Sequence, residues 1–131
     1  MTSPTKSDIK GLGYRMSVNA DDTVVGYCAT IVRDAYLLHY VTQADITSAS
    51  LGDVIGQAWA ALTFLRFLQD TEFGTRTGGE RKRFEYGDAA DLIGSVKRDV
   101  ALKLKQLEAV YPKTSEVDDV CYVYFKNQLF N

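Results

Sequence analysis

Apolar residues recur at helical spacing in two long segments, and these segments predict the core of the fold. Over 49–69 the apolar stripe comprises Leu51, Ile55, Ala58, Leu62 and Leu65. Over 88–111 it comprises Ala89, Ile93, Val96, Val100, Leu104, Leu107 and Tyr111. Further apolar residues, among them Trp59 and Phe64, extend the first stripe around its helix. A helix that is apolar on most sides is buried on most sides, either by its own domain or by a neighbouring subunit.

Two further helices are predicted nearer the N-terminus. A short one over 3–11 begins with Ser3 as cap and Pro4 in the first helical position. A longer one follows the Asp21 and Asp22 cap, with Val24, Cys28, Ile31, Ala35 and Leu38 on its apolar stripe. Residues 24–32 are also rich in β-forming residues, but the spacing and the cap favour a helix. The polar residues 42–48 are predicted to be a connection.

Between the two long helices, residues 70–86 have the pattern of a β-hairpin. Gly78 and Gly79 supply the positive φ angles that a tight two-residue turn requires. The following helix is then expected to open at Asp88 and Asp91 and to end before Pro112. The predicted fold class is therefore mainly α, a small bundle of about four helices with one protruding β-hairpin between the last two long helices.

The chain of 131 residues is expected to form a single domain, with the helical bundle over 1–112. Residues 113–131 are predicted to be a C-terminal arm or packing segment. Their stretch 120–125 fits a helix and a strand equally well. The apolar side chains there either complete the core or dock on another molecule.

The composition argues against several classes of function. With 46% apolar and 24% charged residues the chain is globular, and its net charge of −2 provides no general attraction to nucleic acid or anionic membranes. No segment has the pattern of a signal peptide or a membrane span, which favours a soluble, cytoplasmic protein. Cys28 and Cys121 fit no metal-binding or redox spacing and are expected to be reduced thiols.

Candidate catalytic residues are few. His39 is the only histidine and is interpreted as a residue at the end of a helix, where a cation is favourable. Three acidic pairs, at 21–22, 88 and 91, and 118–119, fall where helices begin or are expected to begin, so capping explains them. The glycines match neither a phosphate-binding loop nor a dinucleotide fingerprint. The sequence predicts no catalytic, cofactor-binding or metal-binding residues, and no enzyme.

The candidate interaction residues lie in the hairpin and the C-terminal segment. Those in the hairpin are cationic and aromatic: Arg76, Arg81, Lys82, Arg83, Phe84 and Tyr86. They serve either to keep an exposed ribbon soluble or to contact a partner. A lone two-stranded ribbon is marginal in water, which favours contact with another surface. Those in the C-terminal segment are apolar and aromatic: Tyr122, Tyr124, Phe125, Leu129 and Phe130.

The order of these parts resembles the head–tail connector (adaptor) proteins of tailed bacteriophages and prophages. The resemblance begins at the short helix over 5–12 and continues through the Asp21 and Asp22 cap to a helix that ends at Tyr40 and Val41. It then includes the alanine-bearing helix around 56–62, the hairpin and the helix over 89–111. It covers nearly the whole chain by layout rather than by diagnostic motif. The aromatic C-terminus beyond Pro112 is longer than the pattern requires.

The resemblance implies a structural virion protein at the head–tail interface, present in the host cytoplasm during assembly. Its copies would form a closed homo-oligomeric ring, commonly of about twelve subunits, beneath the portal. The implied partners are the portal protein and tail-side components, with DNA passing through the channel without sequence-specific binding. The alternative is a small non-enzymatic protein that blocks another macromolecule, such as an anti-defence or immunity protein. An enzyme, with a pocket around His39 or carboxylates, is the third option.

Overall fold

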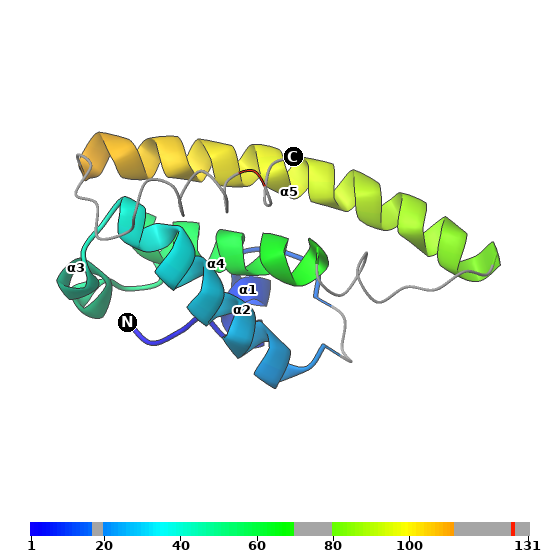
Figure 1. The fold of residues 1–131 in the computed structure, drawn as a ribbon, viewed down its shortest axis with the longest axis horizontal. Coiled ribbons are helices and arrows are strands. Elements are labelled where there is room, and N and C mark those ends of the chain that lie inside the picture. The colour runs from blue at the N-terminus through cyan, green and yellow to red at the C-terminus, as the bar shows by residue number, and fades with distance from the viewer. Residues whose placement is uncertain (17–19, 70–79, 112–126, 128–131) are drawn as a thin grey trace.

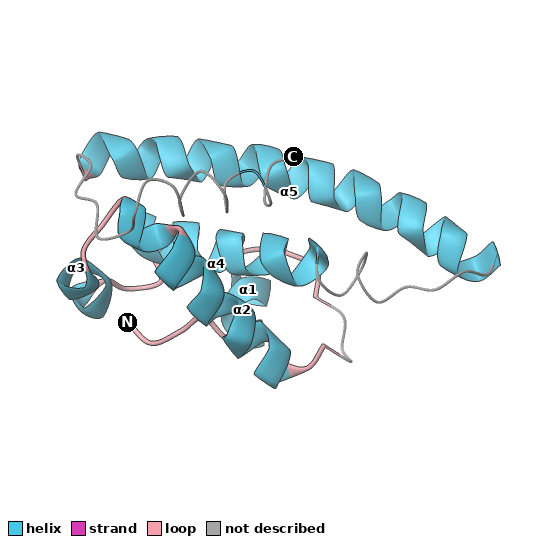
Figure 2. Cartoon of the chain, viewed as in Figure 1, coloured by secondary structure: helices cyan, strands magenta, loops and turns pink. Residues whose placement is uncertain are grey.

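A computed structural model describes residues 1–16, 20–69, 80–111 and 127, and for residues 80–91 it describes the helix backbone. The described part contains five α-helices and one 3₁₀ turn (Figures 1 and 2). They are α1 (Lys6–Gly11), α2 (Asp22–Ala35), η1 (Leu37–His39), α3 (Gln43–Ser48), α4 (Val54–Leu68) and α5 (Glu80–Val110). The prediction of a mainly helical bundle is confirmed.

The predicted β-hairpin is wrong. The described residues contain no strand, and residues 80–86, expected to be its second strand, form the first turns of α5. Residues 70–79, which include the Gly78 and Gly79 turn, lie outside the described residues. Glutamate, arginine and lysine are good helix formers, so the run over 80–83 favours a helix over an exposed ribbon. Asp88 and Asp91 consequently lie inside α5 and do not cap its start.

The central element is α4. Twelve of its fifteen residues are buried, and it packs against α1, α2 and α5. Leu51, assigned above to its stripe, precedes the helix, because Asp53 is its N-cap and accepts a hydrogen bond from the Ser50 backbone N–H at 2.9 Å. Of the two ways to bury this apolar helix, the structure shows the first: its own domain covers it.

Helix α2 packs on α4 through Val25, Cys28, Ala29 and Val32, which are at most 2% exposed. The predicted stripe through Val24 and Ile31 is thus displaced around the helix, because packing on α4 buries Val25 and Val32 instead. The Asp21 cap is confirmed: its carboxylate accepts from the Thr23 backbone N–H at 2.8 Å. The choice of helix over strand is also confirmed.

Two short helices begin with the same capping box. Thr5 caps α1, and its hydroxyl and the Asp8 carboxylate accept each other's backbone N–H groups at 3.3 and 2.9 Å. Thr42 and Asp45 repeat this arrangement at α3, at 3.2 and 3.1 Å. The predicted Ser3 cap is therefore two residues early, and the predicted connection over 42–48 is wrong. Both boxes match the threonine-x-x-acid pattern of a helix start.

Helix α5 follows α4 and extends past it (Figure 1). At 1.5 Å per residue, its 31 residues span about 46 Å and the 15 residues of α4 about 22 Å. Its predicted stripe is confirmed from Ile93 onward, with Ile93, Val96, Val100, Leu104 and Leu107 at most 6% exposed. No helix among the described residues has the length and apolarity to cross a membrane.

Candidate interaction surface

The predicted interaction residues do not form one described surface. Arg81, Lys82, Arg83, Phe84 and Tyr86 lie on the first two turns of α5, where the helical register distributes positions 81–86 around the axis. Arg76 and the C-terminal candidates Tyr122, Tyr124, Phe125, Leu129 and Phe130 lie outside the described residues. A candidate interaction surface in the described part of the chain must therefore consist of exposed residues other than those predicted.

The histidine and the described cysteine are buried in the core. His39 is 3% exposed and meets the Tyr40 ring edge-on, with ring centres 5.4 Å apart. Cys28 is fully buried on the α4 side of α2. Among the described residues, no three histidine, cysteine or carboxylate side chains lie close enough to hold a metal ion. His39 and Cys28 contribute to packing in the described part of the fold.

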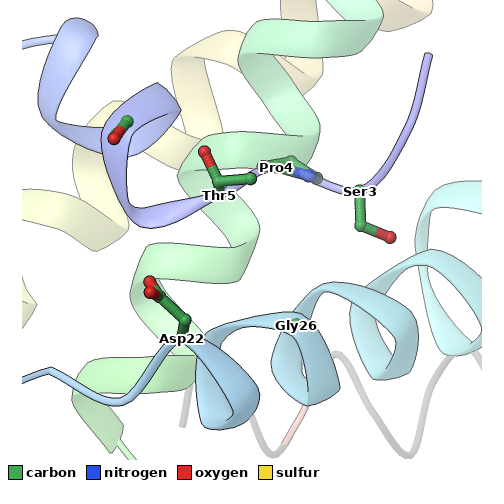
Figure 3. Close-up of a pocket in the computed structure, with 6 residues that line it drawn as sticks. Ser3, Pro4, Thr5, Asp22 and Gly26 are labelled. Carbon is green, nitrogen blue, oxygen red and sulfur yellow. The ribbon is translucent and has the colours of Figure 1, made fainter.

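A depression of about 460 Å³ lies between the start of α1 and the first turns of α2 (Figure 3). Its lining consists of Ser3, Pro4, Thr5, Ser7, Asp22 and Gly26. Asp22 is the only charged residue among these six, and the Thr5 hydroxyl is already used to cap α1. The depression thus combines hydroxyl groups with one carboxylate, without the convergent polar groups of a typical ligand site.

Tyr14 connects the N-terminal segment to both long helices. Its ring stacks on Phe64 of α4 with centres 5.0 Å apart, and its hydroxyl donates a hydrogen bond to the Asp99 carboxylate of α5. Lys103 Nζ lies 3.8 Å from the other oxygen of Asp99. Burial raises the pKa of the Tyr14 phenol above its ordinary value, and the adjacent Asp99 carboxylate raises it further. Tyr14 therefore helps to hold α5 on α4 as a neutral donor.

This raised pKa predicts a loss of stability at alkaline pH. Above about pH 10 the unfolded chain releases the Tyr14 proton while the folded chain keeps it, so the free energy of unfolding falls as pH rises. One proton limits the slope to about 1.4 kcal/mol per pH unit, and solvent screening of the half-buried Tyr14 narrows the pH window over which the decline continues. Melting curves of wild type and Tyr14→Phe from about pH 7 to 11 measure it. The variant should melt lower at neutral pH and decline less steeply; parallel declines would contradict the prediction.

Two helices present exposed stripes on the sides away from α4. The outer stripe of α2 comprises Thr23, Tyr27, Thr30 and Asp34, and the outer stripe of α5 comprises Arg98, Leu102, Lys105 and Ala109. Tyr27 is 69% exposed and Leu102 is 56% exposed, and with Val110 they are the large apolar residues exposed in the described part of the chain. The outer stripe of α5 lies opposite the buried stripe that the sequence predicts. The outer stripe of α2 does not, because packing on α4 buries Val25 and Val32 in place of Val24 and Ile31.

The two outer stripes carry opposite charge. Asp21, Asp22 and Asp34 on or beside α2 outnumber its one cation, Arg33, which binds Asp34 at 2.8 Å. The described side chains of α5 include Lys97, Arg98, Lys103 and Lys105 against two carboxylates, Asp99 and Glu108. Exposed apolar residues flanked by complementary charges are typical of protein–protein contacts.

Compared with known proteins, the chain matches no family model, no curated protein and no solved structure.

Proposed function

We propose that this chain is a structural protein of a tailed bacteriophage, a head–tail connector whose copies form a ring beneath the portal and extend the DNA channel. The order of the helices supports the proposal, since a short capped helix, a helix after the Asp21 cap, the buried α4 and the long α5 follow one another as in the family it resembles. The hairpin no longer contributes, because residues 80–86 are helical. The apolar character of α4 no longer contributes either, because the chain itself buries that helix.

The observation that carries the proposal is the length of α5. It is about twice as long as α4, the helix on which it packs, so its first turns extend past the bundle (Figure 1). A helix that extends past its own core is suited to contact a neighbouring molecule in an assembly. In a ring of identical subunits such contacts are heterologous and close on themselves. The portal and the tail-side components would then contact the two rims of the ring.

The charge of the chain agrees with a channel that DNA passes without sequence-specific binding. The net charge is −2, so the protein as a whole does not attract the phosphate backbone. Among the described side chains of α5, over 92–110, the cations are interleaved with Asp99 and Glu108. We therefore assign the contacts of the ring to protein partners and give it the virion as its location.

Native mass spectrometry across a range of protein concentrations tests this function. A connector ring predicts one closed high-order species, near about twelve copies, that grows at the expense of the monomer without intermediate sizes. A chain that stays a monomer or dimer at every concentration would contradict self-assembly into a ring. It would favour the alternative, a small protein that blocks another macromolecule.

A further inference from the structure

The outer stripes of α2 and α5 match in spacing. In α2 the stripe advances by four, three and four residues, from Thr23 to Asp34, and in α5 it does the same from Arg98 to Ala109. This is the spacing at which two helices pack side by side at a shallow angle of about 20°. All eight residues are exposed in the single chain. Within one chain α2 and α5 each pack on α4, so their outer stripes are available to other molecules.

The charges select one orientation of the two stripes. When the helices run antiparallel, Asp34 lies opposite Arg98, Thr30 opposite Leu102, and Tyr27 opposite Lys105. An arginine then faces a carboxylate that is 55% exposed and bonded by Arg33 at one oxygen, Oδ1. The ammonium of Lys105 can approach the face of the Tyr27 ring, which is favourable for a cation. In the parallel orientation, Asp34 would face Ala109 and Arg98 would face Thr23, so the charges would be unmatched.

We propose that α2 of one copy of this chain packs antiparallel on α5 of a second copy, through these two outer stripes. The contact is heterologous, because each copy uses a different surface, and it leaves one free α2 stripe and one free α5 stripe at the ends of every pair. Such a contact closes into a ring or continues as a filament. This inference rests on the proposed function only in that copies of the chain assemble with one another.

The contact is expected to be weak in isolation. Two helices that meet over about three turns bury less than the roughly 1,200 Å² of a standard stable interface. Assembly should therefore depend steeply on protein concentration, and salt should weaken it, because exposed charges are screened. The contact that closes a ring forms between subunits that are already held together, so it costs little further translational entropy. A closed ring should therefore persist at concentrations where an isolated pair dissociates.

A charge exchange tests the contact in the full chain. Asp34→Arg and Arg98→Asp should each raise the concentration at half-assembly by about tenfold or more in sedimentation velocity, because like charges then face each other. An equimolar mixture of the two variants should assemble again, since each stripe finds an opposite charge on the other variant. The double variant should also assemble by itself. Both residues are exposed, so far-ultraviolet circular dichroism should show an unchanged fold.

A matched apolar pair provides the control. Leu102→Ser should weaken assembly, whereas Val110→Ser, on the same helix at 57% exposure but about 80° around its axis, should leave it unchanged. If none of these substitutions changes the concentration at which the chain assembles, the α2–α5 contact is overturned while the connector function stays in place. A wild-type chain that never assembles would overturn both the contact and the connector function. An open filament that the Asp34 and Arg98 substitutions disrupt would support the contact and contradict the ring.

Discussion

Replacing Gly56 by alanine is expected to destabilise the fold by about 2–4 kcal/mol, although alanine is the better helix former. A Cβ at position 56 would overlap the Ser50 carbonyl oxygen and lie 2.7 Å from Leu51 Cα. These are backbone atoms of the turn before α4, and they are held there because Ser50 and Asp53 exchange hydrogen bonds. The turn must move away from the helix to admit a methyl group, and the packing of the first turn of α4 is lost with it.

Gly94→Ala is the matched control, since no heavy atom beyond its chain neighbours and the nearby backbone of α5 lies within 4 Å of the Cβ it would add. That variant should gain about 0.5–1 kcal/mol, because alanine loses less backbone entropy in a helix than glycine does. Urea unfolding of the two variants, followed by circular dichroism, measures both changes. A Gly56→Ala chain as stable as Gly94→Ala would show that the turn over 50–53 adjusts freely.

The periodicity of the sequence predicted α4 and the second half of α5 because both helices bury continuous stripes. Val100 and Leu107 are fully buried where the helical spacing placed them. The start of α5 was missed because Gly78 and Gly79 are a strong local signal for a turn, and Phe84 and Tyr86 are β-forming residues. Their neighbours over 80–83 favour a helix. Because helix propagation is cooperative, the helix anchored by Ile93 and Val96 extends backwards through these residues.

The exposed surface of α2 depends on how the helix is rotated about its own axis, which periodicity does not determine. The predicted stripe of α2, through Val24 and Ile31, would place Tyr27 at the border of the buried side. Burial of Val25 and Val32 instead rotates the helix by about 100° and turns Tyr27 to the solvent. Both patterns contain enough apolar residues to form a core, so only packing against α4 distinguishes them. Gly56 is similar, because its close contact comes from a turn whose path the sequence does not specify.

Truncating Trp59 is expected to cost about 3–5 kcal/mol, the other large effect in this fold. The indole is 1% exposed where α4 packs on α2, and its Nε1–H donates a hydrogen bond to the Ala29 carbonyl at 2.9 Å. Trp59→Ala removes this hydrogen bond and leaves a cavity between the two helices. Trp59→Phe retains most of the apolar volume but removes the donor, so it should cost about 1–2 kcal/mol.

Comparing the two variants separates packing from hydrogen bonding at the contact of α2 with α4. Tyr27→Ala, an aromatic truncation on α2 at 69% exposure, is the control and should change stability by less than about 0.5 kcal/mol in dilute solution. Chemical unfolding at a concentration below assembly measures all three. Equal losses for Trp59→Phe and Trp59→Ala would assign the whole effect to the hydrogen bond. A small loss for Trp59→Ala would mean that α2 is not anchored through Trp59, and the orientation of its outer stripe would then need another support.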